Sequence, residues 1–362
     1  MMKQKSLIET ILEKPEYQFL QDDPHLGGNI MFLTFGGSLA YGTNLDQSDI
    51  DIRGVTGNLE KELLGISKFE QVVNEETDTT VYGFMKFLNL LMGCNPKAME
   101  MIGCQEQDYT LISRSGQMLL DNKKLFFSKK AILTFGVYAQ TQLRIFQIDS
   151  AEKPVSENEK AKFALTSCAE ALPVLESQYH IPHGMLKLGI VTGKDNMPEI
   201  RAYFDAESCP ENRLGILLKD LNAFTESLIG LDKQYSSLGK RNKRAKNKSR
   251  QQLNKHVMHL IRQYRMVFDI LEDQTVRTYR DEDHDLLMSI RNGAYMKDDG
   301  TYTEEFFDMV SKLDKRFQYD IRHTELPDLP DQRKIEELAI EINRLNLTKE
   351  KEGKKDGYSG QN

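Results

Sequence analysis

An apolar run at residues 29–35 stands out in the hydrophobic pattern near the start of the chain. Its length and its aliphatic and aromatic content predict a buried strand. Gly36, Gly37 and Ser38 end this strand, and the next residues, through Tyr41, predict a turn of helix. Before the strand, apolar positions between residues 7 and 20 predict a short helix that packs on the neighbouring domain. We therefore take residues 1–24 as an N-terminal helical segment.

A second predicted strand carries two acids. Isoleucines at positions 50 and 52 alternate with Asp49 and Asp51, so a strand would turn the isoleucines into a core and both carboxylates to the other face. Two like charges side by side repel each other, and a divalent cation is the usual reason for such a pair. In the preceding turn, glycine lets backbone N–H groups approach phosphate oxygens, and the Ser38 hydroxyl adds a donor. The sequence therefore predicts a phosphate-binding turn at residues 36–38, called the cradle below, beside a metal-binding pair of acids. Nucleotidyl transfer requires both.

A third acid is expected on a neighbouring strand, because a two-metal site normally shares three carboxylates. Glu75, Glu76 and Asp78 come after a predicted strand at residues 69–73. We select Asp78, which comes before a helix predicted at residues 83–92. Glu76 is the substitute because it shares the strand parity of Asp78, and a solvated acidic loop is the alternative.

The pattern becomes helical from about residue 125. A helix predicted at residues 252–271 has one apolar face, and Lys255, His259 and Arg262 line the opposite side. Lys129 stands near the start of an earlier predicted helix. We expect these four residues to contact the phosphates of a nucleotide, with a solvated helix face as the alternative. A small β insertion is predicted near residues 181–206.

Residues 240–250 form a basic run with seven positive side chains and no acid. Such a run is a candidate for contact with a polynucleotide backbone, and a solvated linker is the alternative. The candidates that we name are Lys240, Arg241, Lys243 and Arg244. The last stretch, residues 348–362, is poor in apolar residues and predicts a disordered tail.

Composition is ordinary for a soluble globular protein, with 39% hydrophobic and 28% charged residues among 362. The net charge of -7 gives no general attraction for nucleic acid, so any such contact must come from local patches. The four cysteines form no Cys-x-x-Cys pair and fit a reducing compartment. No apolar run approaches about 20 residues. We therefore expect a cytoplasmic protein without membrane contact.

The Gly-Gly-Ser turn followed by Asp-Ile-Asp resembles the signature of the DNA polymerase beta-type nucleotidyltransferase superfamily. The longer stretch GGSLAYGTNLDQSDIDIRGV is similar to the YcgL-type predicted nucleotidyltransferases of bacteria and phages, some of them linked to RNA repair. Shorter matching segments continue to about residue 345, so the resemblance covers most of the chain.

This resemblance implies an α+β fold. A polymerase beta-like mixed sheet with helices would occupy residues 25–120. A mostly helical C-terminal domain, interrupted by the β insertion, would occupy residues 121–347. The active site is expected in a cleft between these two domains.

The resemblance also implies an activity, the transfer of a nucleoside monophosphate from an NTP to an acceptor hydroxyl with release of pyrophosphate. Asp49, Asp51 and Asp78 would hold two Mg²⁺ or Mn²⁺ ions. The nucleotide would contact Gly36, Gly37, Ser38 and Tyr41. The expected acceptor is an RNA end, in repair or tailing. The alternatives are AMP or NMP transfer to a protein or small molecule, and a catalytically silent RNA-binding protein.

Overall fold

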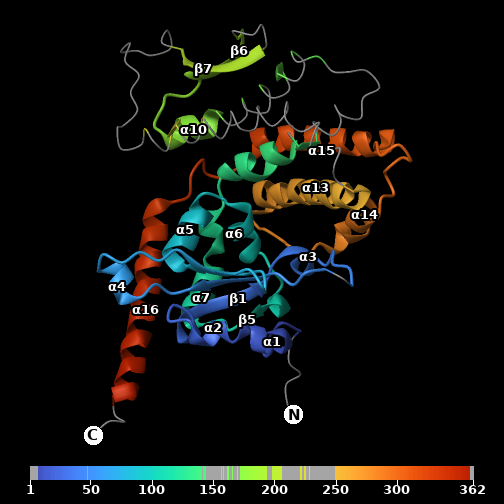
Figure 1. Cartoon of the computed structure of the whole chain (residues 1–362). Coiled ribbons are helices and arrows are strands. Elements are labelled where there is room, and N and C mark those ends of the chain that lie inside the picture. The colour runs from blue at the N-terminus through green and yellow to red at the C-terminus, as the bar shows by residue number, and fades with distance from the viewer. Residues whose placement is uncertain are drawn as a thin grey trace. The chain divides into compact units, whose positions relative to one another are not determined.

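The computed structural model describes residues 7–46, 48–140, 172–193, 198–205 and 249–358, with single residues or pairs between 142 and 228. The chain divides into two compact units (Figure 1). The first comprises Met1–Phe127, Thr275–His284 and Pro330–Asn362, and the second comprises Ser128–Gln274 and Asp285–Leu329.

A mixed sheet forms the centre of the first unit, with five strands in the order β3-β4-β2-β1-β5. Strand β1 (Ile30–Phe35) pairs antiparallel with β2 (Ile52–Thr56) and with β5 (Tyr109–Thr110). Strand β2 runs parallel to β4 (Thr79–Gly83), which pairs antiparallel with the edge strand β3 (Gln71–Asn74). All six residues of β1 are buried, so its sequence is almost continuously apolar and does not alternate.

Short helices surround this sheet, and one long helix ends the unit (Figure 1). Helix α7 packs on both β1 and α16. The contact with β1 requires glycine, because a Cβ on Gly116 would lie 2.2 Å from the Met31 carbonyl oxygen. The helical elements of the unit are α1 (Leu7–Leu12), η1 (Pro15–Tyr17), α2 (Phe19–Asp22), η2 (Gly27–Asn29), α3 (Gly37–Ala40), α4 (Glu60–Leu63), α5 (Phe84–Met92), α6 (Pro96–Met101), η3 (Glu106–Asp108), α7 (Arg114–Asp121), η4 (Lys123–Phe126) and α16 (Gln332–Tyr358).

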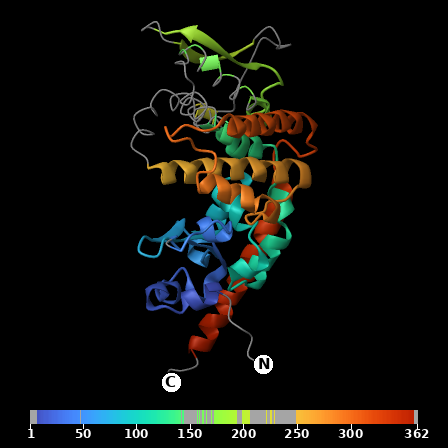
Figure 2. The ribbon, with the colours of Figure 1, turned by 90° about the vertical axis from the view of Figure 1, so that its right-hand side faces the viewer.

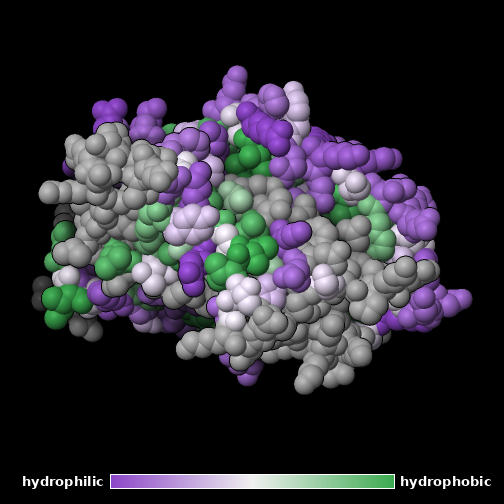
Figure 3. All heavy atoms as spheres, turned by 90° about the horizontal axis from the view of Figure 1, so that it is seen from above, coloured by the Kyte–Doolittle hydropathy of each residue, from purple (hydrophilic) through white to green (hydrophobic). Residues whose placement is uncertain are grey.

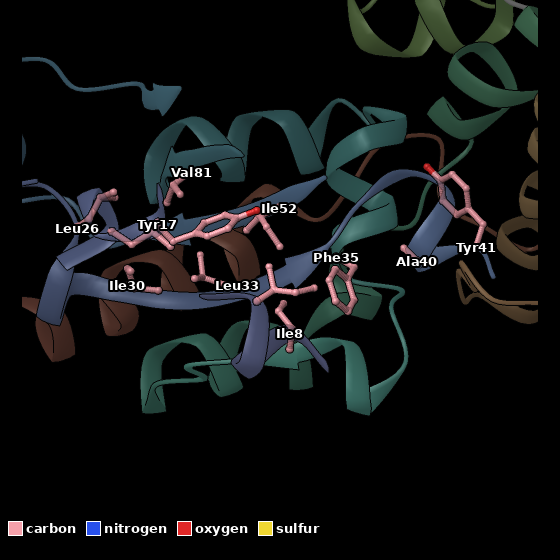
Figure 4. Packing of buried hydrophobic residues seen from close by; sticks show 12 residues of the cluster. Ile8, Tyr17, Leu26, Ile30, Leu33, Phe35, Ala40, Tyr41, Ile52 and Val81 are labelled. Carbon is pink, nitrogen blue, oxygen red and sulfur yellow. The ribbon is translucent and has the colours of Figure 1, made fainter. Parts of the chain in front are cut away.

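A hydrophobic core joins the sheet to the N-terminal helices (Figure 4). Ile8 of α1, Leu33 of β1 and Ile52 of β2 have no exposed surface. Complete burial of an aliphatic side chain stabilises the fold by about 1.5–3 kcal/mol. The isoleucines at positions 50 and 52 both join this core, Ile50 only partly buried, as the alternation with the acids predicts. This core holds the ends of β1 and β2 in place.

Helix α13 (Arg250–Asp273) is the centre of the second unit, and α15 (Glu304–His323) and η5 (Ile132–Val137) pack on it. Both Figure 1 and Figure 2 show α13 and α15 side by side. The apolar face predicted for α13 is buried throughout, and the side opposite it also carries the buried Met266 and Ile270. Both sides of this helix are therefore covered.

The second unit also contains the predicted β insertion. Strands β6 (Leu186–Thr192) and β7 (Pro198–Phe204) pair antiparallel as a hairpin, preceded by α10 (Leu172–Gln178). Helix α14 (Asp281–Arg291) begins in the first unit and ends in the second. Gly293 lies just beyond its C-terminus with φ +87°, the left-handed conformation in which glycine ends helices.

The mixed sheet and the helical C-terminal region confirm the predicted α+β class, but three features differ from the sequence prediction. The last helix is predicted in the C-terminal domain, yet α16 packs on α7 and belongs to the first unit. This helix also continues to Tyr358, beyond the start of the predicted disordered tail. Lysine and glutamate, frequent between residues 348 and 358, are good helix formers and can extend a helix without a core. The segment Thr275–His284 likewise joins the first unit.

The surface shown in Figure 3 carries hydrophilic side chains around smaller groups of hydrophobic ones. Within the described part of the chain, no helix combines the length and the apolar character needed to span a membrane.

Candidate active site

Three neighbouring strand ends bring the predicted cradle and two predicted acids to one edge of the sheet. The last residue of β1 lies opposite the first residue of β2, which lies opposite the first residue of β4. Gly36, Asp51 and Asp78 stand directly next to these ends. The amide of Gly36 donates to the carbonyl of Asp51 at 2.8 Å, and the amide of Ile52 donates to the carbonyl of Asp78 at 3.3 Å. The sheet itself therefore assembles this group.

Gly37 touches the side chain of Asp51 across this edge. It begins α3 with φ +57°, and a Cβ at this position would lie 1.8 Å from Asp51 Oδ2. Only glycine fits both the conformation and the space. The Asp51 carboxylate thus lies against the first turn of α3, whose leading amides have no partner within the helix. A phosphate bound by these amides would lie beside a carboxylate, and two anions in contact need a cation between them.

Arg53 bridges the two acids. Its Nη2 atom lies 2.9 Å from Asp51 Oδ1 and 3.1 Å from Asp78 Oδ1. Its Nη1 atom donates to the backbone carbonyls of Ile52 and Asp78. The side chain of Asp51 is 20% exposed and that of Asp78 is 57% exposed. The guanidinium therefore holds a half-buried carboxylate and an open one at a fixed spacing.

The two carboxyl groups also interact directly. Burial raises the pKa of Asp51 to about 6, and the hydrogen bond with the Asp78 carboxyl adds to this rise, while the positive charge of Arg53 opposes it. The same hydrogen bond lowers the pKa of Asp78. Asp51 is therefore the proton donor when the pair shares a proton. Once both groups are ionised, they form a concentrated negative charge that favours a cation.

Asp49 lies apart from this pair. It is exposed and affects Asp51 only through its charge. Among the residues that the structure describes, no three Asp, Glu, His or Cys side chains come close enough together to hold one metal ion. The structure thus brings together two of the three predicted acids, Asp51 and Asp78. This pair fits one divalent cation, because hard ions take carboxylate oxygens. In the structure, the Arg53 guanidinium lies between the two acids.

Tyr41 belongs to the core and not to the cradle. Its side chain is 7% exposed, and its hydroxyl donates to Glu100 Oε2 at 2.5 Å. Figure 4 shows it next to Ala40 in the core cluster. The Gly36 amide is also occupied, by the Asp51 carbonyl. Of the four predicted nucleotide contacts in this turn, Gly37 and Ser38 remain as candidates for binding through their amides.

The four basic candidates outside the turn belong to the second unit. Lys129 Nζ forms an ion pair with Asp328 Oδ1 at 2.9 Å. On α13, Lys255 is exposed but Arg262 is only 3% exposed. Burial lowers the pKa of His259 to about 3, and the positive charges of Arg262 and Lys255 lower it further. The alternative of a solvated helix face is therefore wrong for Arg262, and His259 is only partly exposed. The basic-run candidates, Lys240, Arg241, Lys243 and Arg244, lie outside the described residues.

One residue of the site, and two residues that contact the loop after it, were not assigned from the sequence. Arg53 shares the strand parity of the aspartates, and that signal could have placed it beside them. By contrast, no local pattern in the sequence indicates that Tyr279 and His284 pack against the loop that follows the cradle. A Cβ on Gly42 would lie 2.2 Å from the Tyr279 ring, and a His284 ring nitrogen lies 2.9 Å from the Gly42 carbonyl oxygen, across 242 positions of sequence.

Residues 8–165 match the model of the RlaP family, described as an RNA repair pathway DNA polymerase beta family. This region contains the glycine turn, Asp49, Asp51, Arg53 and Asp78. No curated protein and no solved structure matches the chain.

Proposed function

With residues 8–165 assigned to a polymerase beta-like nucleotidyltransferase family, we propose that this protein transfers a nucleoside monophosphate from an NTP to the hydroxyl of an RNA end. The observation that carries the proposal is the contact between Gly37 and Asp51, beside Asp78, at one edge of the sheet. It places a turn suited to phosphate directly against two acids suited to a divalent cation.

The residues of this edge have separable tasks in the proposed reaction. The amides of Gly37 and Ser38 bind the terminal phosphates of the NTP. A magnesium or manganese ion held by Asp51 and Asp78 supplies positive charge to the phosphate oxygens when it is bound. Asp49 remains the third acid that we expect to serve a second ion. Asp78 is the more exposed acid of the pair, and it accepts the hydrogen bond of the acceptor hydroxyl.

The bond changes are those of a displacement at phosphorus. The acceptor hydroxyl passes its proton to the Asp78 carboxylate, and its oxygen forms a bond to the α-phosphorus. The bond from that phosphorus to the bridging oxygen breaks, and pyrophosphate leaves. Arg53 keeps the two carboxylates aligned and offsets part of their charge. Positioning and neutralisation of charge therefore account for most of the expected rate enhancement.

The proposal is tested by incubating the full chain with each of the four α-labelled NTPs, Mg²⁺, and RNA, DNA or protein as acceptor. We expect label on RNA ends. Label on protein would instead establish transfer to a protein. No label with any acceptor, together with RNA binding, would establish a catalytically silent RNA-binding protein.

Replacement of Tyr41 by Phe separates its core role from nucleotide binding. We expect the KM for the NTP to stay within about twofold of wild type, because the Tyr41 hydroxyl contacts Glu100. Loss of a hydrogen bond to a charged group lowers the free energy of unfolding by about 1–3 kcal/mol. Steady-state kinetics and thermal unfolding measure the two effects. Tyr319→Phe is the control, because Tyr319 is 61% exposed and should change neither quantity. A large rise in the KM for the NTP with unchanged stability would show that Tyr41 contacts the nucleotide.

A further inference from the structure

Arg291, the last residue of α14, is a buried arginine, and one nitrogen of its guanidinium has no partner among the residues that the structure describes. It lies in the second unit and is 8% exposed. Its Nη1 atom is buried and makes no hydrogen bond within that part of the chain. Burial of an unpaired charge strongly disfavours folding, so a chain that keeps such a charge needs a reason for it.

Other basic groups lie near Arg291, because a Cβ on Gly293, two residues after it, would lie 2.8 Å from Asn254 Nδ2, next to Lys255 on α13. The positive charges that lower the pKa of His259 on α13 come, in decreasing order, from Arg262, Lys255, His256 and Arg291. Arg262 is 3% exposed, whereas Lys255 is exposed. The cluster therefore extends from the interior of the second unit to its surface. Such a concentration of like charge is suited to an anion.

A position in the last turn of a helix does not account for Arg291. The helix dipole favours a cation there, but the effect stays modest even when the charge is partly buried. It is too weak to offset the burial of an unpaired guanidinium. An anionic ligand that enters the cluster would supply the missing partner.

We propose that Arg291, Arg262 and Lys255 bind a phosphate group of a nucleotide, with the His259 ring as an additional hydrogen-bond donor. Three cations suit a phosphate that carries close to two negative charges, whereas one cation balances a carboxylate. A guanidinium also presents a planar fork of donors that matches two phosphate oxygens. The identification of this phosphate as part of a nucleotide rests on the proposed function, but the presence of a phosphate site does not.

The test compares phosphate binding by wild type, Arg291→Met and Arg333→Met in a phosphate-free buffer. Arg333 is 79% exposed in the first unit, so its replacement makes the same change in net charge away from the cluster. Calorimetric titration with inorganic phosphate should show binding that is about 10- to 100-fold weaker in Arg291→Met and unchanged in Arg333→Met. Without phosphate, the Tm of Arg291→Met should equal or exceed that of wild type, because an unpaired buried charge has been removed.

Three probes identify the source of the phosphate. Inorganic phosphate represents the free ion, ATP represents a triphosphate, and a 5′-phosphorylated oligoribonucleotide is compared with its 5′-hydroxyl form. A preference for the 5′-phosphate that disappears in Arg291→Met assigns the site to an RNA end. An Arg291-dependent preference for ATP assigns it to the NTP.

The proposal is overturned if wild type binds none of these probes, or if Arg291→Met binds them all as wild type does. A lower Tm with unchanged affinity would make Arg291 a structural residue only. Asp51→Asn separates this site from the catalytic proposal, since it should keep the binding of inorganic phosphate. If wild type transfers no nucleotide but shows Arg291-dependent binding, the catalytic proposal fails and the phosphate site stands.

Discussion

Replacement of Asp51 by Asn is expected to lower the rate of nucleotidyl transfer at least about 1000-fold. The Asp51 carboxylate lies against Gly37 and beside Asp78, where a neutral amide supplies no charge to hold a cation near the phosphates. The fold should persist, because Asn has nearly the same shape and can still accept the hydrogen bond from Arg53. Incorporation of label from the preferred NTP measures the rate, and thermal unfolding measures stability.

The control for this variant is Asp308→Asn. Asp308 is exposed on α15 in the second unit, so the net charge changes equally while the sheet edge is untouched. Transfer by Asp308→Asn should equal that of wild type. Undiminished transfer by Asp51→Asn would refute the assignment of the sheet edge as the catalytic site. Loss of activity together with a collapse of Tm would show only that Asp51 supports the fold.

Replacement of Gly37 by Ala should lower kcat/KM for the NTP about 100-fold. The new Cβ would lie 1.8 Å from Asp51 Oδ2, so either the turn or the carboxylate must move. A displacement of about 1 Å at a reacting group can cost about 100-fold in rate. The residue also has φ +57°, where an L side chain costs about 1–2 kcal/mol. We therefore expect a loss of activity together with a modest loss of stability.

Gly300→Ala provides the matched control. Gly300 also has a left-handed φ, +86°, but a Cβ there would meet nothing within 4 Å. This variant should lose a similar free energy of unfolding and keep full activity. The comparison isolates the contact with Asp51 from the backbone strain that both positions share. Equal activities of the two variants would show that the contact has no part in transfer.

The local order of residues was enough to predict the site's backbone. A buried strand, a Gly-Gly-Ser turn and a subsequent Asp-Ile-Asp are neighbours in sequence, and strand pairing keeps them neighbours in space. The buried face of α13 was also predictable, because side chains three and four positions apart share one side of a helix. The β insertion was indicated by two apolar runs around a turn. These features depend on spacings of a few residues.

Long-range packing decided the roles of other residues. Tyr41 comes soon after the cradle in sequence, and only its contact with Glu100 shows that it supports the core. The role of Asp49 stays a prediction, because its side chain is exposed and the structure brings only Asp51 and Asp78 together. A short spacing limits how far apart two residues lie, and it does not set the direction of each side chain.

The sequence by itself determined the α+β class and the strand that carries the glycine turn, and it selected Asp51 and Asp78 among the candidate acids. Only the tertiary structure placed Arg53 between those acids and buried the Nη1 atom of Arg291 with no partner in the described part of the chain. It also showed that Tyr279 and α16 pack within the first unit. The physical reason is that periodicity records which side of an element is apolar. It does not record which distant element covers that side, or which charge is enclosed when the two meet.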